Sequence, residues 1–195
     1  LAEGPQEIAY VAETYGTTPV HWLHSLGFLK SDVTAAHCTQ LNDDDIRIMA
    51  ETDTRIAHCP CCNAKLNSGT MRLRCVQEAG ITVGLATDGP ASHNTLDMFQ
   101  EMKFAHKDRT GDVEFLKTNA LLELSTHGAA KAMNRPEVGS LAPGKKADVI
   151  IVDLDKPHCL PVYDHAAALV YSARADDVVT TIVDGRVIME DRILP

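Results

Sequence analysis

The sequence predicts an α/β protein built on a parallel β-sheet, followed by a small β-rich unit. Short apolar runs alternate with helical patterns over residues 1–135, which is the order of βαβ units. Residues 136–195 change to β-branched runs separated by turn residues. The length of 195 residues, with 45% hydrophobic and 23% charged residues, is typical of one globular domain with a small appendage. We therefore expect a boundary near Arg135.

Helix caps and strand-like runs define the elements of the first part. Asn42 begins a helix with three acids in its first turn, and Gly16, Gly27 and Gly80 end other helices. The polar segment 108–112 interrupts a long helical pattern. The expected elements are helices over 7–15 and 18–26, a strand over 33–38, a helix over 42–51, a strand over 55–59, a helix over 71–79, a strand over 81–88, and helices over 95–107 and 114–133.

The β-rich unit begins with turn residues at 139–144. Two β-branched runs follow, over 147–154 and 178–183. The dipeptide Asp184-Gly185 predicts a tight hairpin that leads into a strand over 186–190.

Charge and composition exclude several classes of protein. With 18 basic and 27 acidic residues, the net charge of -9 leaves no basic field for a nucleic acid or an anionic membrane. No apolar run approaches the ~20 residues of a membrane helix. Six cysteines are too few for a disulfide scaffold, so we expect a reducing, cytoplasmic setting. The first residues lack the pattern of a signal peptide and read as a cut within a longer chain.

Three expected strands end in residues that carry chemistry. His37, His58 and Asp88 each follow an apolar run, and the carboxyl ends of parallel strands meet at one rim. Glu3 is a fourth candidate for that rim. Imidazole and carboxylate together suit a divalent metal of the zinc type. The alternative for each histidine is a hydrogen-bonded, half-buried residue, and for Asp88 a turn former before Gly89.

The remaining motifs do not indicate a structural zinc site, a nucleophilic serine or a dinucleotide-binding site. Cys59, Cys61 and Cys62 have no second pair to complete a structural zinc site, so we interpret them as loop and packing residues. Ser92 and Ser125 lie in no nucleophile elbow, and the glycines of 84–89 lack the dinucleotide-binding spacing.

Four segments resemble one known family. They are Thr34-Ala-Ala-His-Cys, residues 57–69 (AHCPCCNAKLNSG), residues 84–98 (GLATDGPASHNTLDM) and residues 139–148 (GSLAPGKKAD). They are similar to the amidohydrolase superfamily, in the group of metal-dependent deaminases and chlorohydrolases of heterocyclic amines. Within it, the resemblance is closest to the 5'-methylthioadenosine/S-adenosylhomocysteine deaminases.

The resemblance implies a metal-dependent (β/α)8 TIM barrel with a β-sandwich built from both chain ends. Residues 1–135 then form the C-terminal portion of the barrel and residues 136–195 part of the sandwich. The family's His-x-His of the first barrel strand, and the histidine that would directly precede Leu1, are absent. We therefore expect this chain to correspond to the C-terminal half of the family.

The resemblance also assigns roles to residues. Asp88 matches an aspartate that binds the metal, contacts substrate and takes a proton from water. His37 matches a histidine that orients the water and the ring substituent, and Glu3 matches a glutamate that binds substrate and protonates a ring nitrogen. The implied cofactor is one Zn²⁺ per site, with Fe²⁺ as second choice. His58, Asn63 and Lys65 would shape a loop and the pocket wall, and Cys59, Cys61 and Cys62 would be reduced and unligated.

The implied activity is hydrolytic deamination of an adenine-type nucleoside, with release of ammonia. A guanine, oxopurine or cytosine deaminase, or an s-triazine chlorohydrolase, is the alternative within the superfamily. The alternative to an enzyme is that the chain is a noncatalytic fragment. The expected partners are a small heterocyclic amine or nucleoside and further copies of the protein in a homo-oligomer, with no nucleic acid and no membrane.

Overall fold

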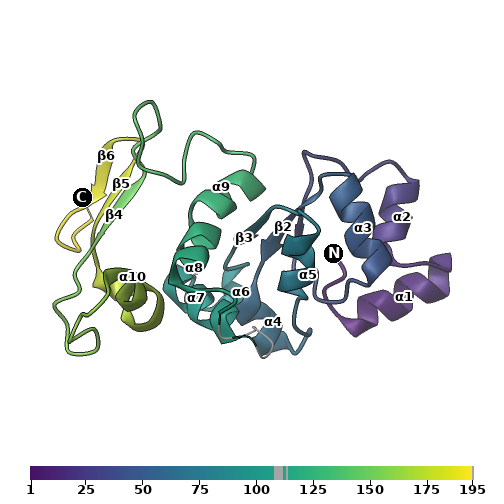
Figure 1. Ribbon diagram of the computed structural model, residues 1–195, viewed down its shortest axis with the longest axis horizontal. Coiled ribbons are helices and arrows are strands. Elements are labelled where there is room, and N and C mark those ends of the chain that lie inside the picture. Colours follow the sequence, from purple (N-terminus) through teal and green to yellow (C-terminus); the bar gives the residue numbers. More distant parts are fainter. Residues whose placement is uncertain (108–111, 113, 195) are drawn as a thin grey trace.

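A three-stranded parallel sheet forms the centre of the computed structural model, which describes residues 1–107, 112 and 114–194 (Figure 1). The strands are β1 (Thr34–Ala36), β2 (Arg55–His58) and β3 (Val83–Leu85), in the order β1-β2-β3. Ala35 is paired with Ile56, and Ala57 with Gly84. The predicted parallel βαβ arrangement is confirmed, although β1 and β3 are shorter than expected.

The helices at the N-terminal end lie close to the expected ranges, although α1 begins two residues earlier than expected and α2 is one residue shorter at each end. Helices α1 (Pro5–Tyr15), α2 (Pro19–Ser25) and α3 (Asp43–Glu51) lie together at one end of the molecule (Figure 1). The Asn42 side chain accepts a hydrogen bond from Asp45 N, and the Asp45 side chain accepts one from Asn42 N, which forms a capping box. Helix α5 (Leu73–Glu78) is shorter than the expected 71–79.

Two short helices follow β2 and β3 where no helix was expected. Helix α4 (Pro60–Leu66) lies in the segment interpreted as a loop, and helix α6 (Pro90–His93) follows Asp88. Each begins with proline, whose fixed φ suits the first helical position. The expectation of a loop over residues 60–69 was therefore wrong for Pro60–Leu66, which is helical.

Helices α7 (Met98–Lys107), α8 (Thr118–Ser125) and α9 (His127–Ala132) cover the other side of the sheet. The single helix expected over 114–133 is wrong, because the backbone turns at Thr126, with φ of -122° and ψ of -90°. This break lets α9 lie directly on β3, where Gly128 is close to the carbonyl oxygen of Val83. Of the polar segment 108–112, only residue 112 lies within the described residues.

The contact of α9 with β3 depends on Gly84. A Cβ built on Gly84 would lie 2.4 Å from Ala129 Cα and 2.9 Å from Ala129 N. We expect Gly84→Ala to lower the free energy of unfolding by about 1–3 kcal/mol, because backbone must move away. Urea denaturation measures this, with Gly89→Ala as control because its Cβ would meet nothing within 4 Å. Equal stability of the two variants would contradict the close contact.

A second, antiparallel sheet lies at the opposite end of the molecule (Figure 1). Its strands are β4 (Val149–Val152), β5 (Val178–Val183) and β6 (Arg186–Met189), in that order. Asp184 and Gly185 both have positive φ, of 49° and 77°, as a type I′ hairpin requires. The predicted hairpin is confirmed.

Three short helical segments lie between β4 and β5 in the chain. They are helix α10 (His165–Ala167), the π-helix η1 (Ala168–Ser172) and the 3₁₀-helix η2 (Ala175–Asp177). Helix η1 packs against α7 and α8. Among the described residues, no helix has both the length and the apolar character needed to cross a membrane.

Candidate active site

Glu3, His37 and Asp88 lie at the same edge of the parallel sheet. His37 directly follows β1, and Asp88 follows β3 by three residues. Glu3 reaches this edge because its segment runs beside the end of β1. Cys38 N donates to Leu1 O at 3.2 Å, and Gln40 N donates to Ala2 O at 3.0 Å. The sequence-based prediction that strand ends bring these residues to one rim agrees with this arrangement.

The backbone at this edge has an uncommon conformation. His37, Cys38 and Asp88 have φ angles of 70°, 56° and 59°. Left-handed backbone is unfavourable for residues with a Cβ, and such residues concentrate at functional sites. The tight turns place the His37 and Asp88 side chains at the rim instead of continuing the strands.

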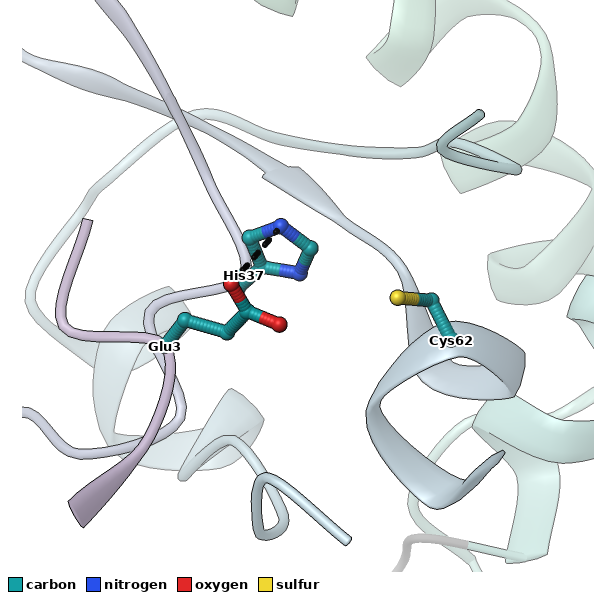
Figure 2. A group of neighbouring side chains, drawn as sticks. All are labelled: Glu3, His37 and Cys62. Atoms are coloured by element: carbon teal, nitrogen blue, oxygen red, sulfur yellow. Dashed lines mark ion pairs between the residues drawn. The ribbon is translucent and has the colours of Figure 1, made fainter. Parts of the chain in front are cut away.

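Glu3 faces His37 across the site. Glu3 Oε2 lies 3.8 Å from His37 Nε2 (Figure 2). Ser68 Oγ donates to Glu3 Oε1 at 3.3 Å. The carboxylate of Glu7 accepts hydrogen bonds from Ala2 N and Glu3 N, both at 2.8 Å. Glu7 therefore fixes the backbone that carries Glu3.

Asn63 sets the orientation of the His37 ring. Its Oδ1 lies 3.0 Å from His37 Nδ1, and both residues are buried. An amide oxygen only accepts, so the ring proton is on Nδ1. His37 Nε2 therefore carries a lone pair, and it is this nitrogen that faces Glu3.

Two side chains donate to one oxygen of Asp88. Ser92 Oγ donates to Asp88 Oδ2, and Cys62 Sγ donates to the same atom at 3.1 Å. The hydrogen bond from Ser92, and after it that from Cys62, lowers the pKa of Asp88, against the opposing effect of burial. Asp88 is therefore an ionised carboxylate held by donors on Oδ2. These donors were not predicted from the sequence, although Ser92 lies only four residues after Asp88.

His58 differs from His37 although both lie at the carboxyl end of a strand, His58 as the last residue of β2 and His37 directly after β1. Its side chain is fully buried, and burial, with a smaller effect of His37, lowers its pKa to about 3. His58 is thus neutral at ordinary pH. It belongs to none of the clusters of metal-type donors that the described residues form.

The cysteines are free thiols. All six are unbridged, and burial raises the pKa of Cys59 to about 12 and that of Cys62 to about 11. Cys62 is nevertheless directed toward the site (Figure 2). The expectation of reduced cysteines agrees with these observations.

Serine in place of the loop cysteines tests whether they hold the resident metal. We expect the Cys61→Ser, Cys62→Ser double variant to keep one equivalent of zinc, because a serine at 62 can still donate to Asp88. Metal analysis after dialysis measures this. Loss of stoichiometric zinc with Asp88 intact would show that the metal lies in this loop.

A second cluster, Cys61, His93 and Glu101, is fully buried. His93 Nε2 lies 2.8 Å from Glu101 Oε1, and Glu101 Oε2 accepts from Cys61 N at 3.1 Å. Leu96 N donates to His93 Nδ1 at 2.8 Å, so the ring proton is on Nε2 and points at the carboxylate. Nε2 is therefore a donor and not a metal ligand. These contacts join α4, α6 and α7.

A third cluster, His158, Cys159 and Asp177, lies near the second sheet. His158 Nε2 lies 2.8 Å from Asp177 Oδ2, and Asp177 Oδ2 also accepts from Arg174 N at 2.8 Å. The charges around Cys159 are mixed, with Asp177 and Asp153 negative and Lys103 and Arg174 positive. The histidine-aspartate pair holds η2 in place.

The donor set at the sheet edge fits zinc. One ligand atom from each of Glu3, His37 and Cys62 lies within 4.8 Å of the others, and Cys62 Sγ donates to the ionised Asp88. Carboxylate oxygen and imidazole nitrogen are ligand atoms of Zn²⁺ in proteins, and a catalytic site keeps one position open. Asp88, with its donors on Oδ2, is the carboxylate available to such an ion.

Known proteins resemble nearly the whole chain. The chain is 45% identical over 195 residues to a 5-methylthioadenosine/S-adenosylhomocysteine deaminase of Pelotomaculum thermopropionicum, across 98% of this chain and 45% of that protein. An adenosine deaminase from Xanthomonas campestris with bound zinc has a TM-score of 0.94 and 32% identity, over 100% of this chain and 45% of that one. An atrazine chlorohydrolase from Arthrobacter aurescens, complexed with zinc, has a TM-score of 0.89 and 28% identity, over 97% of this chain and 43% of that one.

The chain thus spans less than half the length of these relatives. Residues 1–188 match the model of the amidohydrolase family. This match confirms the resemblance found in the four sequence segments. The chain belongs to the amidohydrolase family.

Proposed function

We propose that the protein carrying this chain is a metal-dependent hydrolytic deaminase of an adenine-type nucleoside. The observation that supports it most is the convergence of Glu3, His37 and Asp88 at one sheet edge. The set combines an acid, an oriented imidazole and an ionised carboxylate. The names of the similar deaminases support the substrate class.

The chemistry divides among the three residues. When bound, a zinc ion acts as a Lewis acid and makes water a nucleophile near neutral pH. Asp88 accepts the proton of the attacking water, since its carboxylate is ionised. Glu3 donates a proton to the ring nitrogen next to the attacked carbon, which removes aromatic stabilisation as ammonia leaves. His37 Nε2 accepts a hydrogen bond from the water and holds it in line for attack.

The surrounding architecture completes this proposal. We propose that β1, β2 and β3 are part of a TIM barrel within residues 1–135, and that the antiparallel sheet is part of a β-sandwich within residues 136–195. A zinc site has three or four protein ligands, so the partners of Asp88 come from elsewhere in the protein. Six free thiols support a reducing, cytoplasmic location, and a homo-oligomer remains our prediction.

A chlorohydrolase of s-triazines is the second candidate. The similar fold of the zinc-bound atrazine chlorohydrolase favours it, because the same rim serves both reactions and the loops choose the substrate. Deaminases of guanine, oxopurines or cytosine fall in the same class.

A substrate panel separates these candidates. We expect ammonia release from adenosine, methylthioadenosine and S-adenosylhomocysteine, with little from guanine or cytosine and no chloride from atrazine. The Asp88→Asn variant, purified in parallel, identifies any contaminating deaminase. Activity on free bases alone would refute the nucleoside assignment, and chloride release would favour the second candidate.

A further inference from the structure

We propose that Glu101 is a positioning residue for the reaction, because it anchors the two short helices whose side chains hold Asp88 and His37. Glu101 lies on α7, and its side chain has no exposed surface. The proposal rests on the proposed function, since Asp88 and His37 are the residues that we assign to deamination. Its structural part, the anchoring of α4 and α6, is tested separately from turnover.

The two carboxylate oxygens of Glu101 face two different segments. Oε1 lies 2.8 Å from Nε2 of His93, the last residue of α6, and neither side chain is exposed. Oε2 accepts a hydrogen bond from the backbone N of Cys61, in the first turn of α4, at 3.1 Å. Removing one partner of a buried pair is strongly unfavourable, so both segments are held against α7.

The anchored turn of α4 carries two residues of the site. Cys62 and Asn63 directly follow Cys61 in the sequence. Cys62 Sγ donates to Asp88 Oδ2 at 3.1 Å, and Asn63 Oδ1 lies 3.0 Å from His37 Nδ1. A shift of this turn therefore changes a donor to the carboxylate and the acceptor that orients the imidazole.

Helix α6 has the same relation to Asp88. Ser92 directly precedes His93 and donates to Asp88 Oδ2. The ring of His93 is fixed at both nitrogens, because Nδ1 accepts from Leu96 N at 2.8 Å while Nε2 faces Glu101. One carboxylate on α7 thus fixes the positions of both donors to Asp88.

Glu101→Gln tests the anchor in the protein that carries this chain. Glutamine keeps the size of the side chain but has one acceptor oxygen, so its NH2 group meets one of the two N–H groups. We expect kcat to fall about 10²-fold, as misplaced groups at a site cause, with KM and zinc content less affected.

The matched control is Asp177→Asn, at a second buried carboxylate. Asp177 also lies 2.8 Å from a histidine Nε2, that of His158, and accepts from a backbone N, that of Arg174, but it directly precedes β5. We expect both variants to have a lower melting temperature and the control to keep the kcat of the parent. An equal loss of kcat in the two variants would overturn the proposal.

Two substitutions of His93 separate anchoring from local folding, and they serve also where Glu101→Gln fails to fold. The amide nitrogen of glutamine can replace Nε2 as the donor toward Glu101, whereas the oxygen of asparagine can replace Nδ1 as the acceptor for Leu96 N. We expect kcat of His93→Gln to be about 10-fold higher than that of His93→Asn. The reverse order would overturn the proposal.

The histidine ring of the site gives a readout that does not depend on turnover. In protein labelled with ¹⁵N-histidine, the Nδ1–H resonance of His37 is identified by its absence in His37→Asn. We expect this resonance to broaden or disappear in Glu101→Gln and to persist in Asp177→Asn. An unchanged resonance in Glu101→Gln would overturn the positioning role. Its loss there, with a parent protein that releases no ammonia, would support the anchoring and refute the deaminase.

Discussion

Asp88→Asn should abolish measurable deamination and weaken zinc binding in the protein that carries this chain. The amide keeps the shape of the side chain but loses the charge that binds the ion and the site that accepts the proton. Asparagine also tolerates the positive φ of 59° found here, so the backbone need not change. Loss of proton transfer alone lowers kcat by about 10²–10⁴-fold. Ammonia release and metal content after dialysis measure the two effects.

The control for this variant is Asp97→Asn. Asp97 caps α7 by accepting from Phe99 N at 2.8 Å, and asparagine caps helices as well. We expect near-normal activity and zinc content there. Near-normal turnover of Asp88→Asn would refute the assignment of Asp88, and lost zinc in Asp97→Asn would indicate general unfolding.

His37→Asn should lower kcat by about 10²-fold or more with zinc content less affected. Asparagine accommodates the left-handed backbone at this position, but it cannot extend an imidazole Nε2 toward Glu3. The water then lacks its acceptor, while Asp88 retains both of its donors. The measurement is kcat and KM at saturating zinc, together with the metal content of the purified variant.

His24→Asn, an exposed change on α2, is the control for folding. We expect it to match the parent protein in kcat and melting temperature. Complete loss of zinc from His37→Asn would make His37 a ligand of the resident ion and not an orienting residue. A fall in KM without a fall in kcat would equally contradict the assigned role.

The sequence was sufficient for much of the fold because its local signals agree with the tertiary structure. Asn42 with three acids and Asp184-Gly185 at the hairpin each determine a structure within a few residues. The break at Thr126 was not predictable in this way. It follows from the close packing of α9 on Gly84, which is distant in sequence.

The candidate site was also predictable only in part from the sequence. Strand ends and the family resemblance predicted that His37 and Asp88 would meet at one edge, and the structure agrees. The hydrogen bonds of Asn63 to His37 and of Cys62 to Asp88 each join segments 26 residues apart. The buried pair of His93 and Glu101 was also missed, because Glu101 lies in an ordinary helical pattern. Such pairings depend on three-dimensional proximity that no local pattern encodes.

At residue 88, the left-handed backbone favours glycine for stability, whereas the proposed activity requires aspartate. Glycine adopts this conformation without the steric penalty of a Cβ, so Asp88→Gly would relieve the backbone while it removed the carboxylate. Selection for thermal stability alone would therefore favour glycine at residue 88. A laboratory evolution experiment without a requirement for turnover should accumulate that substitution, whereas selection for activity should retain the strained aspartate.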